Sequence, residues 1–347
     1  MKKNIVLEIK NPYNSILSRK GYSIDKGDVP PEDIKNIKKE LTVCPISHIS
    51  YGPSPNPFRL FKESPQRIYV PKSYGIQKFG NPLVNKLNKL NEEEIDIRFK
   101  GSIREKQLPV INTFIDKCKT EGGGIVVLPC GFGKTVIGLN IISQLKKKTL
   151  VVCHKEFLLN QWKERIEMFL PEAKLGYIQQ KKVDIEGKDI VLGMLQSISM
   201  KEYEDNAFSS FGFTIIDECH HIAAEVFSRA LPKINSYYNL GLSATPKRKD
   251  GLSKVFHWYL GPMIYEVKQR ENTPIQINTL FYKSNNRDYN KEELNYMNKI
   301  CAPKMINKIT ENERRTHIII QVLKKLLAQN KKILVLSDRR NHLTDIF

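Results

Sequence analysis

The sequence predicts an α/β fold built on a parallel β-sheet, and three observations support this prediction. Between residues 104 and 267, short runs of apolar residues alternate with segments whose apolar residues recur at helical spacing. The apolar runs lack the alternation of a half-exposed strand, which indicates strands covered on both faces. Small and acidic residues follow several runs, where the carboxyl ends of parallel strands form ligand sites.

Each element of this region has its own pattern. An amphipathic helix over residues 104–118 precedes the first apolar strand, Gly124–Leu128. A helix follows from Val136 to Leu145, where apolar residues recur at helical spacing. A later helix ends at Phe169. The remaining predicted strands are residues 149–153, 189–193, 213–216 and 239–242.

Composition divides the chain into three regions. Residues 1–98 are rich in Pro, Gly, Asn and Lys with short strand-like pieces, which predicts a small α+β accessory domain. Residues 99–272 form the α/β domain. Residues 273–347 begin a new unit with strands at 275–282 and 332–337 around a mostly helical segment, too few elements to close a sheet.

The charge favours a polyanionic partner. The chain has 56 Lys+Arg against 37 Asp+Glu, a net charge of +19, which favours nucleic acid over a membrane surface. Residues 101–220 are nearly balanced with 16 basic and 15 acidic residues, so the excess lies elsewhere. A solvated lysine-rich surface is the alternative explanation. No apolar run approaches the roughly 20 residues that span a bilayer, so no membrane partner is expected.

Cysteines and aromatic residues limit other functions. The six cysteines are scattered without a C-x-x-C pair, which disfavours a zinc module and a secreted disulfide framework and indicates a reducing, intracellular compartment. In the amino-terminal region, aromatic residues interleave with basic ones. They either stack on nucleic-acid bases or build an ordinary small core, and both readings stay open. They are Tyr51, Phe58, Phe61, Tyr69 and Tyr74.

The segment after the first strand has the chemistry of a phosphate-binding loop. Gly131 and Gly133 let backbone N–H groups approach phosphate oxygens, and the following helix points its positive end at the anion. Lys134 would reach the β- and γ-phosphates, and the Thr135 hydroxyl would ligate magnesium. ATP and Mg²⁺ are therefore the expected cofactors. The whole predicted loop is Pro129-Cys130-Gly131-Phe132-Gly133-Lys134-Thr135.

That loop departs from the general phosphate-loop pattern at one position. The pattern has Gly where this chain has Leu128. A Gly-rich strand-to-helix turn without a ligand is the alternative reading of residues 129–135. The apolar strand before the loop and the helix after it favour the phosphate site.

An acidic pair closes the strand at residues 213–216. Asp217 is expected to hold magnesium, partly through water, and Glu218 to act as the general base toward the attacking water. His220 would then lie near the γ-phosphate and sense hydrolysis. An ordinary acidic strand terminus is the alternative, and the upstream phosphate loop weighs against it.

Three further segments are candidates for binding or coupling. The hydroxyls of Ser243 and Thr245 follow a strand and would link the magnesium site to a nucleic-acid surface. Lys247 and Arg248 would touch phosphates, although such a run is often only a solvated loop. Gln107, which follows Arg104 by three residues, would read adenine through its amide.

In this order, these segments resemble the motifs of superfamily 2 helicases of the DEAD/DEAH-related group, here with a DECH sequence at residues 217–220. The resemblance implies a RecA-like P-loop domain and assigns Arg104 and Gln107 to the adenine side. Residues 152–162 look like the family's motif Ia, whose loop contacts the nucleic-acid backbone. The contacts implied for nucleic acid are made by His154, Lys155, Gln196, Ser197, Lys247 and Arg248.

Residues 241–251 resemble more narrowly the XPB/UvsW-type branch, which includes helicases of large cytoplasmic DNA viruses. The resemblance implies an ATP-dependent helicase or translocase, with DNA favoured over RNA, acting in transcription or repair. A viral protein of this kind would work in the host cytoplasm or virion, and a cellular one in the nucleus or cytoplasm.

The chain also departs from that family. Residues 332–340 resemble motif IV of a second RecA-like domain, but no segment matches motifs V and VI, which supply arginine fingers. Such fingers contribute about 10³–10⁵ to rate in related phosphoryl transfers. We therefore expect weak hydrolysis by this chain alone, with the missing half or a second polypeptide completing the motor. The alternatives are a nucleic-acid-binding module that uses ATP only as a switch, and a small-molecule kinase, which the Gln107 match disfavours.

Overall fold

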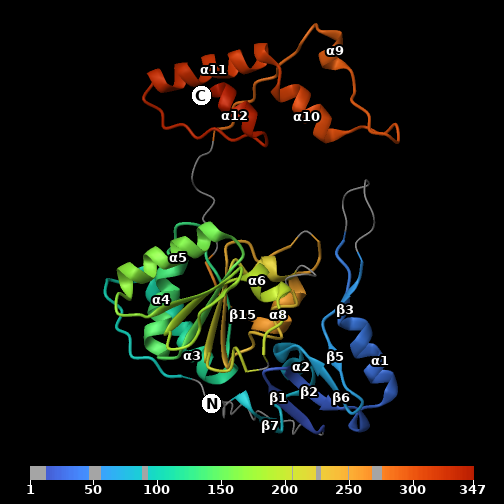
Figure 1. The fold of residues 1–347 in the computed structure, drawn as a ribbon, viewed down its shortest axis with the longest axis vertical. Helices are drawn as coiled ribbons and strands as arrows, with labels where there is room; N and C mark the ends of the chain where they lie inside the picture. Colours follow the sequence, from blue (N-terminus) through green and yellow to red (C-terminus); the bar gives the residue numbers. More distant parts are fainter. Residues whose placement is uncertain are drawn as a thin grey trace, which may run out of the picture. The chain divides into compact units, whose positions relative to one another are not determined.

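The structure is a computed structural model, and it falls into two compact units, residues 1–270 and 271–347, each described by itself (Figure 1). No helix in the described part of the chain is both long and apolar enough to cross a membrane. The described residues are 13–46, 56–87, 93–204, 206–223, 228–248, 250–267 and 276–347.

An eight-stranded sheet dominates the described part of the first unit and confirms the predicted parallel α/β fold (Figure 1). Its order is β11-β10-β12-β9-β13-β14-β8-β15, and all neighbours are parallel except β10 and β11. The strands are β8 (Gly123–Val127), β9 (Thr149–Cys153), β10 (Leu175–Gln179), β11 (Lys182–Val183), β12 (Ile190–Met194), β13 (Phe213–Asp217), β14 (Tyr238–Ser243) and β15 (Met263–Glu266).

Helices cover both faces of this sheet, because successive strand residues point to opposite sides. Val126 of β8 packs into the core cluster under three helices, and Ile125 and Val127 pack into the cluster on the other face. The first three helices are α3 (Leu108–Glu121), α4 (Lys134–Leu145) and α5 (Glu156–Phe169). The other face carries α6 (Leu195–Met200) and α8 (Ser253–Leu260). The short helices are η3 (Glu105–Gln107) and η4 (Cys219–Ala223).

The amino-terminal region has its own sheet, of order β5-β6-β2-β1-β7. Its strands are β1 (Ser15–Ser18), β2 (Gly21–Asp25), β5 (Lys62–Glu63), β6 (Arg67–Val70) and β7 (Val84–Asn85), and a separate ribbon pairs β3 (Thr42–Val43) with β4 (Phe58–Arg59). Its helices are η1 (Lys26–Asp28), α1 (Pro31–Glu40) and α2 (Lys72–Phe79).

This region shares its hydrophobic core with the larger sheet. Tyr74 on α2 packs edge-to-face on Trp258 of α8 with ring centroids 5.4 Å apart. Arg19 donates to the carbonyl of Asn235 at 3.1 Å, and Lys72 donates to that of Tyr237 at 2.7 Å. The structure therefore joins the described part of the amino-terminal region to the α/β domain in one unit, because their apolar faces bury each other.

The described part of the second unit, residues 276–347, contains helices joined by irregular segments. Its helices are α9 (Arg287–Asn290), α10 (Ala302–Thr310), α11 (Glu313–Ala328) and α12 (Arg340–Ile346). The strands predicted at 275–282 and 332–337 are wrong for the described residues 276–282 and 332–337, which are in no strand. A strand needs a neighbour to accept its hydrogen bonds, and the sheets described here offer these segments none.

Candidate nucleotide and nucleic-acid site

The predicted nucleotide residues meet at the carboxyl edge of the large sheet. In the parallel register Asp217 of β13 pairs with Leu242, and Ser243 of β14 pairs with Val127 of β8. The phosphate loop leaves β8 two residues later, at Pro129. The neighbouring strands β13, β14 and β8 thus bring the phosphate loop close to Asp217 and Ser243, which lie far from it in the chain.

The phosphate loop has the backbone conformation that its glycines predict. Gly131 and Gly133 have φ of +75° and +97°, a region that side-chain-bearing residues rarely adopt. A Cβ at Gly131 would meet nothing within 4 Å, whereas one at Gly133 would lie 2.4 Å from Nε2 of Gln107. Helix α4 begins at Lys134, so its positive end points at the loop.

Gln107 contacts the backbone of the phosphate loop. Its Nε2 donates to the carbonyl of Phe132 at 2.9 Å, and its Oε1 accepts from the Arg104 N–H at 3.0 Å. The side chain is 2% exposed, whereas Arg104 is exposed. Both ends of the Gln107 amide therefore hold protein backbone, and its adenine contact stays a prediction. Lys106 places its ammonium 4.9 Å from the centre of the Phe132 ring.

Lys134 and Glu218 form an ion pair in the middle of the site, with Nζ and Oε1 2.5 Å apart. Burial alone would raise the pKa of Glu218, but the hydrogen bond and charge of Lys134 outweigh it and lower that pKa. Glu218 is therefore a carboxylate at neutral pH, as a general base must be. Its φ of +48° is unusual for a residue with a side chain.

Asp217 lies deeper, with 7% of its surface exposed. Its Oδ2 accepts from the indole N–H of Trp162 at 2.9 Å, and its Oδ1 accepts from the Glu218 N–H at 3.0 Å. Burial raises the pKa of Asp217, while the bond from Trp162 and the charge of Lys134 oppose that rise. The carboxylate is thus oriented by two donors before any ligand binds.

The residues fit magnesium only together with a nucleotide. The Thr135 hydroxyl and the Asp217 carboxylate are the oxygen donors that Mg²⁺ prefers. Within the described ranges no group of three or more His, Cys, Asp or Glu side chains forms a metal site by itself. Magnesium usually keeps several waters and takes substrate phosphates as ligands, which suits so sparse a protein contribution.

A chain of contacts leads from Glu218 to the loop after β14. Nδ1 of His220 lies 3.5 Å from Oε2 of Glu218 and 2.9 Å from Oγ of Ser243. Oγ of Ser243 also accepts the N–H of Thr245 at 3.1 Å. The Thr245 side chain itself is exposed. The segments predicted to couple the two sites are therefore in contact, although their role stays a prediction.

Three histidine rings extend this chain toward β9. The ring of His220 lies 4.3 Å from that of His221, which stacks on His154 at 3.8 Å with 29° between the planes. Burial and the neighbouring His221 lower the pKa of His154 to about 4, and burial likewise lowers the pKa of His220 and His221. Sequence reasoning missed His221, because spacing alone does not reveal a ring stack.

The predicted nucleic-acid residues differ in the exposure and in the hydrogen bonds of their side chains. Lys155, Gln196 and Lys247 are exposed after β9, β12 and β14, on the same edge of the sheet. The hydroxyl of Ser197 instead accepts the Gln180 N–H at 2.9 Å. The side chains of Lys155, Gln196 and Lys247 are therefore accessible to a polyanion, with the Lys155 ammonium 5.9 Å from the centre of the Phe157 ring.

The Arg248 side chain contacts other protein groups. Its guanidinium bonds to both carboxylate oxygens of Asp250, through Nε at 2.9 Å, and to the carbonyl of His220. Asp250 in turn accepts from the N–H of Leu252 through Oδ1 at 3.2 Å. Arg248 thus ties its loop to the histidine segment, and a phosphate contact by it stays a prediction.

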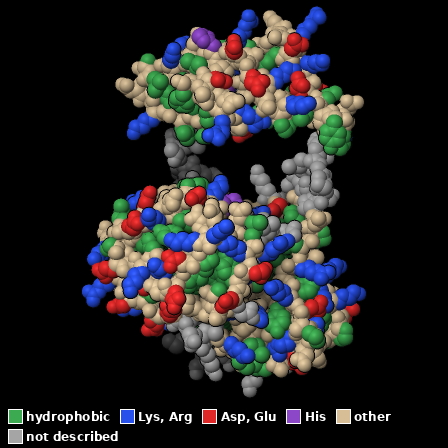
Figure 2. All heavy atoms as spheres, in the orientation of Figure 1, with side chains coloured by type: hydrophobic (Ala, Val, Ile, Leu, Met, Phe, Trp, Pro, Cys, Tyr) green, Lys and Arg blue, Asp and Glu red, His purple; other side chains and the backbone are tan. Residues whose placement is uncertain are grey.

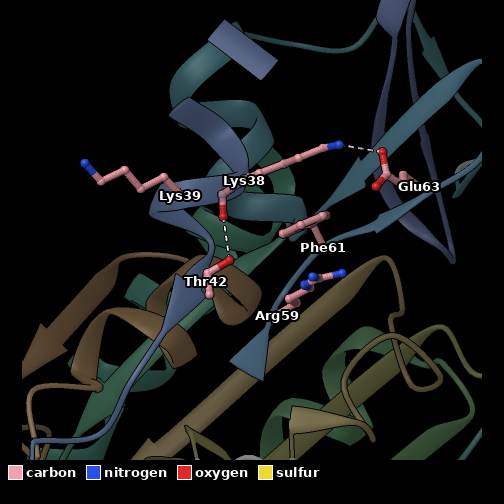
Figure 3. A pocket seen from close by; sticks show the side chains of 6 residues that line it. All are labelled: Lys38, Lys39, Thr42, Arg59, Phe61 and Glu63. Atoms are coloured by element: carbon pink, nitrogen blue, oxygen red, sulfur yellow. Dashed lines mark hydrogen bonds and ion pairs between the residues drawn. The ribbon is translucent and has the colours of Figure 1, made fainter. Parts of the chain in front are cut away.

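A basic hollow lies on the amino-terminal region, with a volume of about 460 Å³ (Figure 3). The acid that lines it, Glu63, pairs with Lys26 at 2.9 Å and Lys38 at 2.8 Å, and these lysines lower its pKa to about 2. Figure 2 shows that Lys and Arg elsewhere on the visible face of this unit are interspersed with Asp and Glu. The hollow is lined by Lys38, Lys39, Thr42, Arg59, Phe61 and Glu63.

Most aromatic residues of this region belong to the core instead. Phe58 and Tyr74 are buried, and the Tyr74 hydroxyl donates to Glu40 at 2.7 Å. Phe61 is partly exposed in the hollow, with the Arg59 guanidinium 5.9 Å from its ring centre. Of the two readings of these aromatic residues, core packing holds for Phe58 and Tyr74, and base stacking by Phe61 stays a prediction. Tyr51 lies outside the described residues.

Known proteins resemble this chain in sequence. Residues 100–248 match the family model of the type III restriction enzyme res subunit. A protein of Acanthamoeba polyphaga mimivirus that carries the name of an ATP-dependent RNA helicase is 34% identical over 95% of this chain and 64% of its own length. The DNA 3'-5' translocase XPB2 of Sulfurisphaera tokodaii is 32% identical over 50% of this chain and 38% of its own.

Among solved structures, the UvsW helicase of bacteriophage T4 aligns with a TM-score of 0.47 at 14% identity, over 70% of this chain and 95% of that one. This chain spans just under two thirds of the length of the mimivirus relative and a smaller share of the Sulfurisphaera one.

Proposed function

This chain belongs to the superfamily 2 helicases, and on that premise we propose that it is a motor that couples ATP hydrolysis to movement on nucleic acid. The observation that carries the proposal is one contact network at the ends of β8, β13 and β14. In it Lys134 pairs with Glu218, and Glu218 is linked through His220 to Ser243.

Binding of nucleotide would begin at the phosphate loop. Its backbone N–H groups and the start of α4 favour an anion, and Lys134 adds a full charge. The phosphates would compete with Glu218 for that ammonium group, because the two side chains contact each other at 2.5 Å. Nucleotide binding thereby frees the Glu218 carboxylate for its catalytic role.

Hydrolysis would use the two carboxylates differently. Glu218 stays ionised at neutral pH and takes a proton from the attacking water. Asp217 and Thr135 would hold magnesium, which neutralises developing charge on the phosphates when it is bound. Asp217 is nearly buried and fixed by two donors, whereas Glu218 is more open, which suits a structural role for the first and a reactive role for the second.

Coupling to nucleic acid would follow the ring stack. A change at Glu218 reaches Ser243 through His220, and it reaches His154 and the neighbouring Lys155 through His221. Ser243 ends β14 and His154 directly follows β9, and the loops after these two strands carry the exposed Lys247 and Lys155. We infer that this path transmits the state of the nucleotide to the track.

DNA is the favoured track, since the translocase of Sulfurisphaera tokodaii is named for DNA, although the mimivirus relative is named for RNA. Full turnover would need an arginine finger at the phosphates, as the resemblance to two-domain helicases implies. A second polypeptide, or a further half of the motor, would supply it. Viral relatives and six free cysteines support a reducing compartment such as the host cytoplasm.

Steady-state ATPase assays test the proposal. Turnover would be measured with duplex DNA, single-stranded DNA, RNA or no polymer, beside Lys134→Ala and with or without an added second motor domain. Stimulation by one polymer that disappears in Lys134→Ala supports a motor and identifies its track. No ATP binding by the wild type would refute the proposal.

A nucleic-acid-binding module that uses ATP only as a switch is the second candidate. The basic hollow beside Phe61 favours it, because its lysine and arginine side chains could bind nucleic acid without a part in ATP hydrolysis (Figure 3). This candidate predicts nucleic-acid affinity that changes with ATP while turnover stays absent even with the second motor domain present.

A further inference from the structure

One indole contact in the site has no role in the mechanism above. The Nε1–H of Trp162 on α5 donates to Oδ2 of Asp217 at 2.9 Å, and the Trp162 side chain is fully buried. The two residues are 55 positions apart and come from a helix and a neighbouring strand. A buried indole N–H needs a partner, but nothing requires that partner to be the residue expected to hold magnesium.

The bond completes the fixation of the carboxylate. Oδ1 of Asp217 accepts the Glu218 N–H at 3.0 Å, while Oδ2 accepts the indole. With one donor on each oxygen, rotation of the carboxylate about its last torsion breaks at least one bond. Each oxygen still has a lone pair left for a ligand. The arrangement therefore orients Asp217 without using up its capacity to bind.

The Trp162 indole also packs against α4, the helix that follows the phosphate loop. A Cβ at Gly138 of α4 would lie 2.8 Å from Cη2 of Trp162, so the ring packs directly on the helix backbone there. Helix α4 starts at Lys134. Trp162 thus contacts both the helix that would receive the phosphates and the carboxylate that would receive the metal.

We propose that Trp162 is a positioning residue that orients the Asp217 carboxylate for magnesium and whose emission reports occupation of the site. This inference rests on the proposed function. A purely structural Trp162 would only fill the space beneath Gly138, and Phe would fill most of it. The hydrogen bond to Asp217 separates the two roles, because Phe lacks the donor.

Trp162→Phe tests the role, with Trp258→Phe as the matched control. Trp258 is also largely buried but packs on Tyr74, away from Asp217. ATP binding is measured by calorimetry at a series of free Mg²⁺ concentrations and in EDTA. Partners that orient metal ligands typically contribute about 10- to 100-fold to metal affinity. We expect Trp162→Phe to raise the Mg²⁺ requirement by about tenfold and to leave binding in EDTA within about twofold.

A double-mutant cycle places the effect at Asp217. In an Asp217→Asn background, Trp162→Phe should change the Mg²⁺ requirement no further, since interacting residues are not additive. An equal effect in both backgrounds, or an equal loss with and without Mg²⁺, overturns the inference. If the wild type itself binds ATP with no Mg²⁺ dependence, the magnesium site of the proposed function fails as well.

Fluorescence gives a readout that keeps Trp162 in place. The chain has two tryptophans, so in Trp258→Phe the emission comes from Trp162 alone. Adding Mg²⁺ and ATP should change its intensity or maximum, and Asp217→Asn in the same background should abolish most of that change. Emission that ignores Mg²⁺–ATP while calorimetry shows binding would overturn the inference.

Discussion

The carboxyl edge of the large sheet has two halves that are built differently. At β8, β13 and β14 the functional side chains are largely buried and bonded to one another, as Lys134 is to Glu218 and Asp217 to Trp162. At β9 and β12 the candidate nucleic-acid residues Lys155 and Gln196 are exposed. Groups that act on one defined ligand are pre-oriented, whereas groups that touch a long polyanion work by charge.

This difference predicts large, specific effects in the first half and small, salt-dependent effects in the second. The histidine stack between them, His220, His221 and His154, should show intermediate effects.

Glu218→Gln should have the largest effect on turnover. Removal of a general base costs about 10²–10⁴ in rate. ATP binding should persist or strengthen, because a neutral Gln no longer holds the Lys134 ammonium at 2.5 Å. Single-turnover hydrolysis and calorimetric binding on the same sample check this. Parallel loss of binding and turnover would mean that Glu218 is needed for folding of the site and not for the proton.

Lys134→Ala should abolish tight ATP binding. Loss of one partner of a partly buried charged pair costs about 2–5 kcal/mol, and ~3 kcal/mol corresponds to an affinity lower by about 100-fold. Isothermal titration measures it. Lys119→Ala, on an exposed lysine in the last turn of α3, is the control and should be neutral. Unchanged affinity in Lys134→Ala would remove the phosphate loop from the mechanism.

Ser243→Ala breaks the link between the nucleotide site and the loop after β14. It removes the oxygen that contacts Nδ1 of His220 at 2.9 Å and accepts the Thr245 N–H. Coupling energies of 1–3 kcal/mol correspond to about 5- to 150-fold. We expect stimulation of ATPase by nucleic acid to fall about tenfold with basal turnover nearly unchanged. Ser23→Ala, at a buried serine of β2, is the control, and equal stimulation in both variants would contradict the coupling path.

The histidine stack should also make the free energy of unfolding depend on pH. The pKa of His154 is lowered to about 4 in the folded protein, against 6.5 for a free histidine. The unfolded chain therefore binds more protons between roughly pH 6.5 and 4, so stability falls as pH falls through that window. Denaturant melts at several pH values measure this. His154→Gln should flatten the curve, and a curve identical to that of the wild type would contradict the assignment.

The exposed lysines after β9 and β14 should respond weakly. Lys155→Ala and Lys247→Ala should each lower nucleic-acid affinity a few-fold and reduce the slope of log K against log salt by about 1. Fluorescence anisotropy over a salt series measures both quantities. Because these side chains are exposed, the melting temperature should not change. A slope that stays the same would show that the track lies elsewhere, for example at the hollow beside Phe61 (Figure 3).

Much of the first half could be predicted from sequence. The parallel sheet, the phosphate loop and the strand-end carboxylates follow from patterns within about ten residues, because glycine φ angles and strand burial are local properties. The prediction of a strand at 332–337 was wrong because a strand is not a local property: it forms only beside a second strand that shares its hydrogen bonds. Apolar β-branched residues there cannot specify one by themselves.

By itself, the sequence determined which chemical groups stand at the ends of which strands, and so the family and the cofactors to be expected. Only the tertiary structure decided their partners. It turned the Gln107 amide onto the phosphate loop, tied Arg248 to Asp250 and placed the Trp162 indole on Asp217. The physical reason is distance along the chain: Trp162 and Asp217 are 55 residues apart, and they meet because β13 lies beside β9 in the sheet.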